Sequence, residues 1–316
     1  MRALAKFAFI FALIWTSLYE IQNQFPYLLT GADAIFQAKL KRERAPHLFR
    51  KPDSPGVLFF GNSKALSGFM PDLFDDASRE AGHPTESYNL GLPAYYYFVD
   101  RLESILAAGN IPKYIVITLP WAPNDEPPDA FHFIRHDFQL MDELFPFHLL
   151  GRDLLMAATS SIRMRGFLIR YYETNRRIVE RVIADRGYFF IYDSKYSPNN
   201  QLPAGFRGAF DRPGAVFERL AGTRGREFEK LVRLLKTYHI TCLLVPTYYR
   251  VGQAAPPPAQ NQRLRAELAS YPDIRLLGPD YVLFKNRYFS DGSHLNPEGA
   301  RLYTLYIADL VAPSLR

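Results

Sequence analysis

Short apolar runs alternate with helix-like segments along most of this 316-residue chain. These runs are short and strand-like, and the third of them is rich in β-branched residues, which is typical of buried strands. They occupy residues 56–61, 86–91, 114–120, 240–246 and 273–278. Apolar positions recur at helical spacing in residues 64–81, 95–108, 226–239, 260–270 and 296–312. Buried strands that alternate with helices predict a parallel sheet covered on both faces, that is, a three-layer α/β/α sandwich.

The stretch between the third and fourth apolar runs is far longer than a single crossover helix requires. We therefore expect a mainly helical insertion at about 122–222 within a domain that spans 55–316. In residues 161–187, a candidate long helix, arginines alternate with aromatic and aliphatic residues. Such a pattern is typical of a solvated helix face, and it is also compatible with contact to lipid headgroups or to a partner protein.

An apolar segment preceded by positive charge occupies residues 1–22. Arg2 and Lys6 come before an unbroken apolar stretch that runs from Phe7 to Trp15. No small-residue cleavage pattern follows at the usual distance, so the pattern favours an uncleaved signal anchor over a cleaved signal peptide. An amphipathic helix packed on the domain is a further alternative. Positive charge before the span predicts a single-pass protein whose body lies outside the cytoplasm, in the periplasm or the extracellular space.

Residues 23–54 have the composition of a polar and basic stalk between this anchor and the domain. The run KLKRER at 39–44 places basic charge on the translocated side of the membrane, which weighs against the orientation just described.

The charge balance is mildly basic, with 38 Lys and Arg against 32 Asp and Glu, and the surplus is spread over several segments. No basic stripe, zinc-finger or RNA-binding signature is present, so the sequence predicts no nucleic-acid partner. An anionic membrane or an envelope polymer fits the mild surplus better. Cys242 is the single cysteine, which excludes an internal disulfide and a metal site built on cysteines. We expect neither a metal nor a cofactor.

Four features fall at the carboxyl ends of the expected strands, where parallel sheets bind their ligands. Ser63 follows the first strand, and Gly91 follows the second, where a free backbone N–H can face a ligand. Asn124 lies just past the third strand. Asp291 and His294 stand in the loop before the last helix.

The spacing of Asp291 and His294 suits acid–base chemistry. On a tight loop the carboxylate accepts a hydrogen bond from one imidazole nitrogen, and the other nitrogen then takes a proton from Ser63. A serine hydroxyl becomes a nucleophile when an adjacent base accepts its proton. The backbone N–H groups of Ser63 and Gly91 are placed to stabilise the resulting oxyanion. This combination favours a catalytic serine over a turn in which Ser63 only caps a helix.

Two further groups of side chains are candidates with structural alternatives. Tyr95 and Tyr96 follow Gly91 closely enough to line a sugar-sized cleft, although tyrosines are more often core or rim residues. His132 and His136 are four residues apart, which is compatible with metal ligation, but a surface role or packing within the insertion is favoured.

Three sequence blocks resemble those of the SGNH (GDSL-type) hydrolase superfamily: FFGNSKALSGF, YNLGLPA and SDGSHLNPEGA. The resemblance covers residues 56–121 and 223–312 and implies a flavodoxin-like α/β/α fold. It implies that Ser63 is the nucleophile and that Asp291 and His294 complete the triad.

The same resemblance implies that Gly91 is an oxyanion donor. The chain departs from the family pattern at Asn62, where the first block usually has Asp, and at Asn124, whose segment APND lacks the glycine of the third block. Within the superfamily the chain is similar to membrane-anchored envelope acyl-transfer proteins, namely the D-alanyl transfer proteins of the DltD type and the alginate O-acetylation proteins.

The sequence thus predicts serine-dependent acyl transfer to or from a cell-envelope polysaccharide or polymer, as an O-acyltransferase or an esterase. The expected partners are an acyl donor, the envelope polymer and the membrane, and the resemblance alone implies a membrane-bound O-acyltransferase. A non-catalytic SGNH-like scaffold or accessory protein of an envelope-modification assembly is the alternative.

Overall fold

The computed structural model describes residues 2–28, 31–51, 53–92, 98–118, 150–163, 168–191, 195, 199–208, 225–252 and 260–315. Its helices are α1 (Arg2–Gln24), α2 (Gly31–Arg44), α3 (Ser63–Gly68), α4 (Pro71–Glu80), α5 (Phe98–Ala107), α8 (Leu150–Arg163), α9 (Leu168–Ala184), α10 (Arg226–Tyr238), α11 (Gln260–Leu268) and α12 (Pro297–Val311). Its short 3-10 helices are η1 (Pro26–Leu28), η4 (Asn286–Tyr288) and η5 (Ala312–Ser314). Its strands are β1 (Gly56–Phe60), β2 (Glu86–Asn89), β3 (Tyr114–Thr118), β4 (Thr241–Val245), β5 (Thr247–Arg250), β6 (Ile274–Leu276) and β7 (Tyr281–Phe284).

The chain divides into two compact units. The first comprises residues 1–38 and 126–181, and its described elements are helical. The second comprises residues 39–125 and 182–316 and holds the strands described here. We call them the helical unit and the α/β unit.

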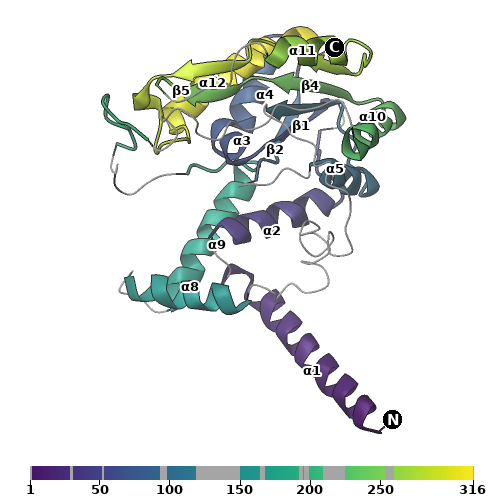
Figure 1. Ribbon diagram of the computed structural model, residues 1–316, viewed down its shortest axis with the longest axis vertical. Coiled ribbons are helices and arrows are strands. Elements are labelled where there is room, and N and C mark those ends of the chain that lie inside the picture. The colour runs from purple at the N-terminus through teal and green to yellow at the C-terminus, as the bar shows by residue number, and fades with distance from the viewer. Residues whose placement is uncertain are drawn as a thin grey trace. The chain divides into compact units, whose positions relative to one another are not determined.

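Five strands of the α/β unit form one parallel sheet in the order β2-β1-β3-β4-β6 (Figure 1). β1 lies between its neighbours, so that Phe59 is opposite Asn89 of β2 on one side and Val116 of β3 on the other. The expected α/β class with a parallel sheet is thereby confirmed. The sequence pattern did not predict the second sheet, in which β5 and β7 pair in parallel.

Side chains of the sheet pack into two apolar clusters because successive residues of a strand point to opposite faces. Leu58 and Leu244 belong to a cluster that also contains residues of α5, α10 and α11. Phe59 and Leu243 belong to a cluster that also contains residues of α4 and α12. Both faces of the central strands are therefore buried, as the unbroken apolar runs indicate.

The first crossover consists of two helices rather than the single helix expected over 64–81. α3 ends at Gly68, and α4 begins with Pro71 at its first position. Proline has no amide hydrogen and its ring clashes with the preceding turn, so it starts a helix readily and interrupts one that is already running.

The expected stalk over 23–54 is corrected from residue 39 onward. Lys39, Glu43 and Leu48 are buried within the α/β unit. The two charged residues have buried partners: Glu43 forms an ion pair with Arg101, which is itself 1% exposed, and Lys39 donates to the Gly91 carbonyl. The basic run at 39–44 is thus partly an interior structural element, and its charges do not all bear on membrane orientation.

The N-terminal helix α1 is apolar and exposed. Its segment Ala3–Ile21, 19 residues long, is sufficiently long and apolar to cross a membrane, and none of it is buried. At 1.5 Å per residue it spans about 28 Å, close to the ~30 Å hydrocarbon thickness of a bilayer. A membrane anchor and a signal peptide share this property.

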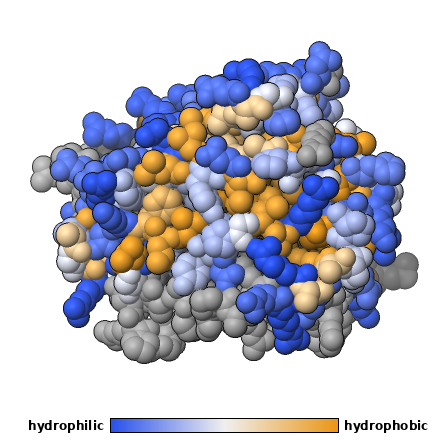
Figure 2. Space-filling model, turned by 90° about the horizontal axis from the view of Figure 1, so that it is seen from above, coloured by the Kyte–Doolittle hydropathy of each residue, from blue (hydrophilic) through white to orange (hydrophobic). Residues whose placement is uncertain are grey.

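Figure 2 shows the face that lies at the top of Figure 1, where α11 and α12 run. Apolar residues gather in the middle of this face, and hydrophilic residues surround them. Elsewhere in the α/β unit most large apolar side chains of the sheet are buried in the two clusters.

Candidate functional site

Ser63 stands at the tip of the turn that joins β1 to α3. β1 is buried along its whole length and ends at Phe60. Asn62 then caps α3, because its side-chain oxygen accepts a hydrogen bond of 2.9 Å from the Lys64 amide. The cap is therefore Asn62, and Ser63 is the first helical residue with its side chain half-buried.

Asp291 and His294 lie in a closed loop just before α12. Phe289 and Leu295, both fully buried, form an antiparallel bridge across the base of this loop. The Ser290 amide also donates to the His294 carbonyl at 3.0 Å. Two buried apolar side chains and paired backbone groups thus fix the positions from which the acidic and imidazole side chains project.

The structure brings the three predicted triad residues into one hydrogen-bonded chain. His294 Nε2 lies 2.9 Å from Ser63 Oγ, and His294 Nδ1 lies 2.7 Å from Asp291 Oδ2. An ionised carboxylate accepts only, so Nδ1 carries the hydrogen and Nε2 is left as the acceptor that faces the serine hydroxyl.

The environment of Asp291 favours its ionised form. Burial acts to raise the pKa of Asp291, but the hydrogen bond from His294, its electrostatic attraction and the backbone N–H groups of Ser293 and His294 together lower it below its ordinary value. These amides donate to Asp291 Oδ1 at 2.8 and 2.7 Å. The side chains of His294 and Asp291 are 16% and 24% exposed, so the pair remains accessible from solvent.

Gly91 lies beyond the end of β2 and against α3. A Cβ at this position would come within 2.9 Å of the Ala65 side chain and closer still to the Leu66 amide, so only glycine permits the approach. The Gly91 N–H donates to Asn89 Oδ1 at 2.9 Å. This corrects the expectation of a free N–H at Gly91, because the side chain two residues earlier already accepts from it.

Asn89 is a site residue that the sequence analysis missed. Its amide nitrogen donates to three carbonyl groups of the α3 region, those of Ala65 at 2.8 Å, Leu66 at 3.2 Å and Phe69 at 2.8 Å. It is fully buried. One side chain therefore ties the helix that carries Ser63 to the loop that carries Gly91. An asparagine in an otherwise strand-like run was the available signal.

A buried charge cluster, formed by Lys39, Glu43 and Arg101, binds the carbonyl groups of the loop that carries Gly91. Lys39 Nζ donates to the Gly91 carbonyl at 2.7 Å, and Arg101 Nη1 donates to the Leu90 carbonyl at 2.9 Å. Burial, followed by the positive charge of Arg101, lowers the pKa of Lys39 well below its ordinary value, although Glu43 acts in the opposite direction. Because a peptide N–H points away from its carbonyl, these bonds turn the N–H groups of Gly91 and Leu92 toward the α3 side.

Three sequence-predicted candidates remain. Asn62 is described as the cap of α3, a role that accounts for asparagine at this position. Tyr95 and Asn124, predicted to line or serve the site, lie outside the described residues, as do His132 and His136. Among the residues that the structure describes, no group of three or more metal-ligating side chains is placed to hold a metal ion.

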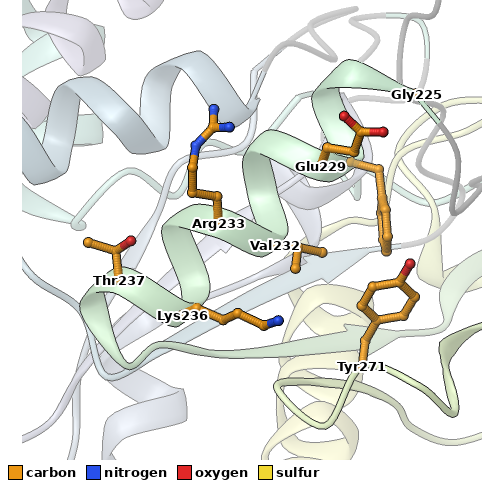
Figure 3. Close-up of a pocket in the computed structure, with 8 residues that line it drawn as sticks. Gly225, Glu229, Val232, Arg233, Lys236, Thr237 and Tyr271 are labelled. Atoms are coloured by element: carbon orange, nitrogen blue, oxygen red, sulfur yellow. The ribbon is translucent and has the colours of Figure 1, made fainter.

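A pocket of about 500 Å³ lies along α10 (Figure 3). Phe228 and Tyr271 meet edge to face within it, with ring centroids 4.9 Å apart. Arg233 and Lys236 also line it, and Figure 3 shows their side chains extending in different directions. None of Ser63, Asp291 and His294 contributes to this pocket, so it does not mark the candidate site.

Comparisons with protein-family models, with curated proteins and with solved structures found no match for this chain.

Proposed function

We propose that this protein is an SGNH-type serine acyltransferase or esterase that acts on a cell-envelope polymer through an acyl-serine intermediate. The observation that carries the proposal is the continuous chain from Ser63 through His294 to Asp291, with hydrogen-bond distances of 2.9 and 2.7 Å. A nucleophile, a base within reach and a group that orients the base are the three parts that such chemistry needs.

The place of the triad in the sheet supports the same proposal. When the five strands of the large sheet are numbered among themselves, β6 becomes the fifth and the order is 2-1-3-4-5. This is the flavodoxin-like order, in which ligands bind at the switch point between the first and third strands. Ser63 follows β1, which is the strand at that reversal. We therefore extend the α/β assignment to the three-layer SGNH sandwich as part of the proposal.

The proposed reaction begins when Ser63 Oγ attacks the carbonyl carbon of an ester and its proton passes to His294 Nε2. The tetrahedral intermediate then expels the alcohol, which takes the proton from His294 and leaves an acyl-serine. Water or a polymer hydroxyl attacks this ester in the second half, again with His294 as the base. The acceptor decides whether the protein is an esterase or a transferase.

Stabilisation of the oxyanion in this proposal starts from the Ser63 amide. It is the first amide of α3, and the first four amides of a helix have no intrahelical acceptor. Gly91 is the second proposed donor. When a substrate binds, its N–H has to leave the Asn89 oxygen for the oxyanion or donate to both.

The N-terminal helix supports an envelope substrate as part of the proposal. α1 has the length and composition of a membrane span, and an anchored domain outside the cytoplasm meets envelope polymers rather than cytoplasmic metabolites. An acyl donor and a membrane-bound O-acyltransferase partner belong to the proposal through the family resemblance.

One observation favours the alternative, a non-catalytic scaffold. The Gly91 N–H is already paired with Asn89, which is the arrangement of a closed structural turn. Labelling of the serine separates the two functions.

The test is intact-mass labelling of the full chain in detergent with a fluorophosphonate, which reacts with activated serines. The full chain is needed because Lys39 and Glu43 belong to the α/β unit. We expect one adduct, mapped to Ser63, that disappears in Ser63→Ala. Removing the general base in His294→Ala slows the reaction by about 10²–10⁴-fold.

The matched control is Ser270→Ala, which removes an exposed hydroxyl at the end of α11 and leaves labelling unchanged. A folded wild type that takes up no label, or an adduct that persists in Ser63→Ala, would transfer the assignment to the scaffold.

A further inference from the structure

The residues that follow α1 are held by α9. The Tyr27 ring meets the Tyr172 ring edge to face at 5.2 Å between centroids, and Phe25 meets the same ring at 6.4 Å. Asn175 Nδ2 donates to the Tyr27 carbonyl at 3.0 Å. α8 contacts η1 in the same stretch. Both helices are therefore fixed, within the helical unit, beside the point where α1 ends.

Large apolar side chains are exposed on these two helices. Leu155 on α8 is 65% exposed and Ile169 on α9 is 72% exposed. Leu154 and Leu168 next to them are exposed as well, and so is Phe25. Single exposed apolar residues are ordinary on a protein surface, but five in the segments packed beside the end of a candidate membrane span are not.

We propose that α8 and the first turn of α9 lie on the membrane surface beside α1, with their exposed apolar side chains at the boundary between lipid headgroups and acyl chains. The inference rests on the part of the proposed function in which α1 is a membrane anchor, and it does not depend on the serine chemistry. The occupant of this surface is lipid, because the surface is continuous with the end of the span.

Distances along α9 fit this position. Ile169 precedes Tyr172, the residue that packs on the segment just after α1, by three residues. This corresponds to about 4–5 Å along the helix axis, so Ile169 lies less than one helical turn from the level at which the span ends, where interfacial helices bury their apolar face.

Charge also fits an anionic lipid surface. Arg176 pairs with Glu173 at 2.7 Å and with Glu180 at 3.8 Å, so its charge is largely compensated. Arg170 and Arg177 are exposed on the same helix and present positive charge to headgroup phosphates. The arginine-rich pattern of this segment is thereby explained by a surface that has apolar residues at one end and cations beyond it.

The experiment attaches an environment-sensitive NBD fluorophore to single cysteines in the full chain and measures quenching by nitroxide-labelled lipid. Native Cys242 does not compete, because it is fully buried and burial raises the pKa of its thiol. The test positions are Leu155→Cys and Ile169→Cys. The matched control is Glu180→Cys, which is exposed on nearly the same side of α9 but about 16 Å further along the axis. Phe11→Cys, within α1, reports on the anchor itself.

In vesicles of phosphatidylcholine and phosphatidylglycerol, we expect quenching at 155 and 169 to exceed that at 180 by about threefold or more. If the probe at 11 is quenched while those at 155 and 169 match the probe at 180, the surface contact is refuted and the anchor stands. If the probe at 11 is not quenched, the anchor fails and this inference with it. Blue-shifted but unquenched probes at 155 and 169 would mean that protein, as in a second copy of this chain, covers the surface instead.

Discussion

The two sides of the candidate site are held by different forces. On the triad side, Asp291 and His294 project from a loop and remain 24% and 16% exposed, and the His294 side chain contacts the Ser63 hydroxyl. On the Gly91 side, the backbone is gripped by fully buried side chains, among them Asn89 and Lys39. The triad side can transfer protons in contact with solvent. The backbone on the Gly91 side cannot shift without breaking buried hydrogen bonds.

This difference separates chemistry from stability. Removal of a triad side chain leaves few buried groups without partners, so it changes the reaction more than the fold. Loss of a side chain on the Gly91 side leaves buried carbonyls unsatisfied, which costs about 1–3 kcal/mol for each group. Substitutions on the triad side should therefore reduce activity more than stability, and substitutions on the Gly91 side should reduce stability more than activity.

The largest expected effect is on the triad side, in Asp291→Asn. Asparagine preserves the shape but no longer selects the imidazole tautomer whose Nε2 accepts from Ser63, so fluorophosphonate labelling should slow by about 10³–10⁴-fold. The free energy of unfolding near neutral pH should change far less than the activity. A labelling rate within tenfold of the wild type would remove Asp291 from the proposed mechanism.

The same variant carries a pH signature. Because the folded-state pKa of Asp291 is lowered, ionised Asp291 stabilises the fold above its unfolded pKa of about 3.9, and this contribution is lost as the pH falls through the folded value. Chemical denaturation between pH 7 and pH 3 should therefore show wild type and Asp291→Asn converging in stability toward acid. A constant difference would contradict the ionised state proposed for this carboxyl.

Next in size is Asn89→Ala, on the Gly91 side. It removes the donor to three carbonyl groups of the α3 region and the acceptor of the Gly91 N–H, so it should lower the free energy of unfolding by roughly 2–4 kcal/mol. Asn62→Ala is the matched control, because it removes one cap hydrogen bond at the other end of α3 and should cost about 1 kcal/mol. Equal losses of unfolding free energy in the two variants would show that Asn89 does not connect α3 to the Gly91 loop.

The smallest expected effect is a change in how the free energy of unfolding depends on pH, in Lys39→Met. The pKa of Lys39 is lower in the folded than in the unfolded state, so the unfolded chain binds more protons and stability rises with pH between the two values. The variant should lose part of this rise when unfolding is followed from pH 7 to pH 10. Lys41→Met, an exposed neighbour on α2, should keep the wild-type slope. Identical slopes in both variants would argue against a buried, shifted Lys39.

Periodicity and spacing in the sequence were enough to determine the α/β class, most strand positions and the three residues that meet at the carboxyl ends of the strands. For Ser63 they sufficed because the strands of a parallel sheet end at one edge, where sites form. The loop with Asp291 and His294 follows β7 of the second sheet, so its place was predicted from the Asp-x-x-His spacing before the last helix rather than from a strand end. Ser63 and His294 are 231 positions apart and still lie 2.9 Å from each other.

Only the tertiary structure decided which polar residues would be interior. The sequence analysis assigned Lys39 and Glu43 to a basic stalk and assumed a free Gly91 N–H, because local composition does not show that Arg101 and the Gly91 carbonyl offer buried partners. Asn89 lies in a strand-like run, and its local sequence does not show that carbonyl groups of the α3 region accept hydrogen bonds from its side chain. A charge or an amide can be buried when its partners are already in place, and those partners come from elements far away in the sequence.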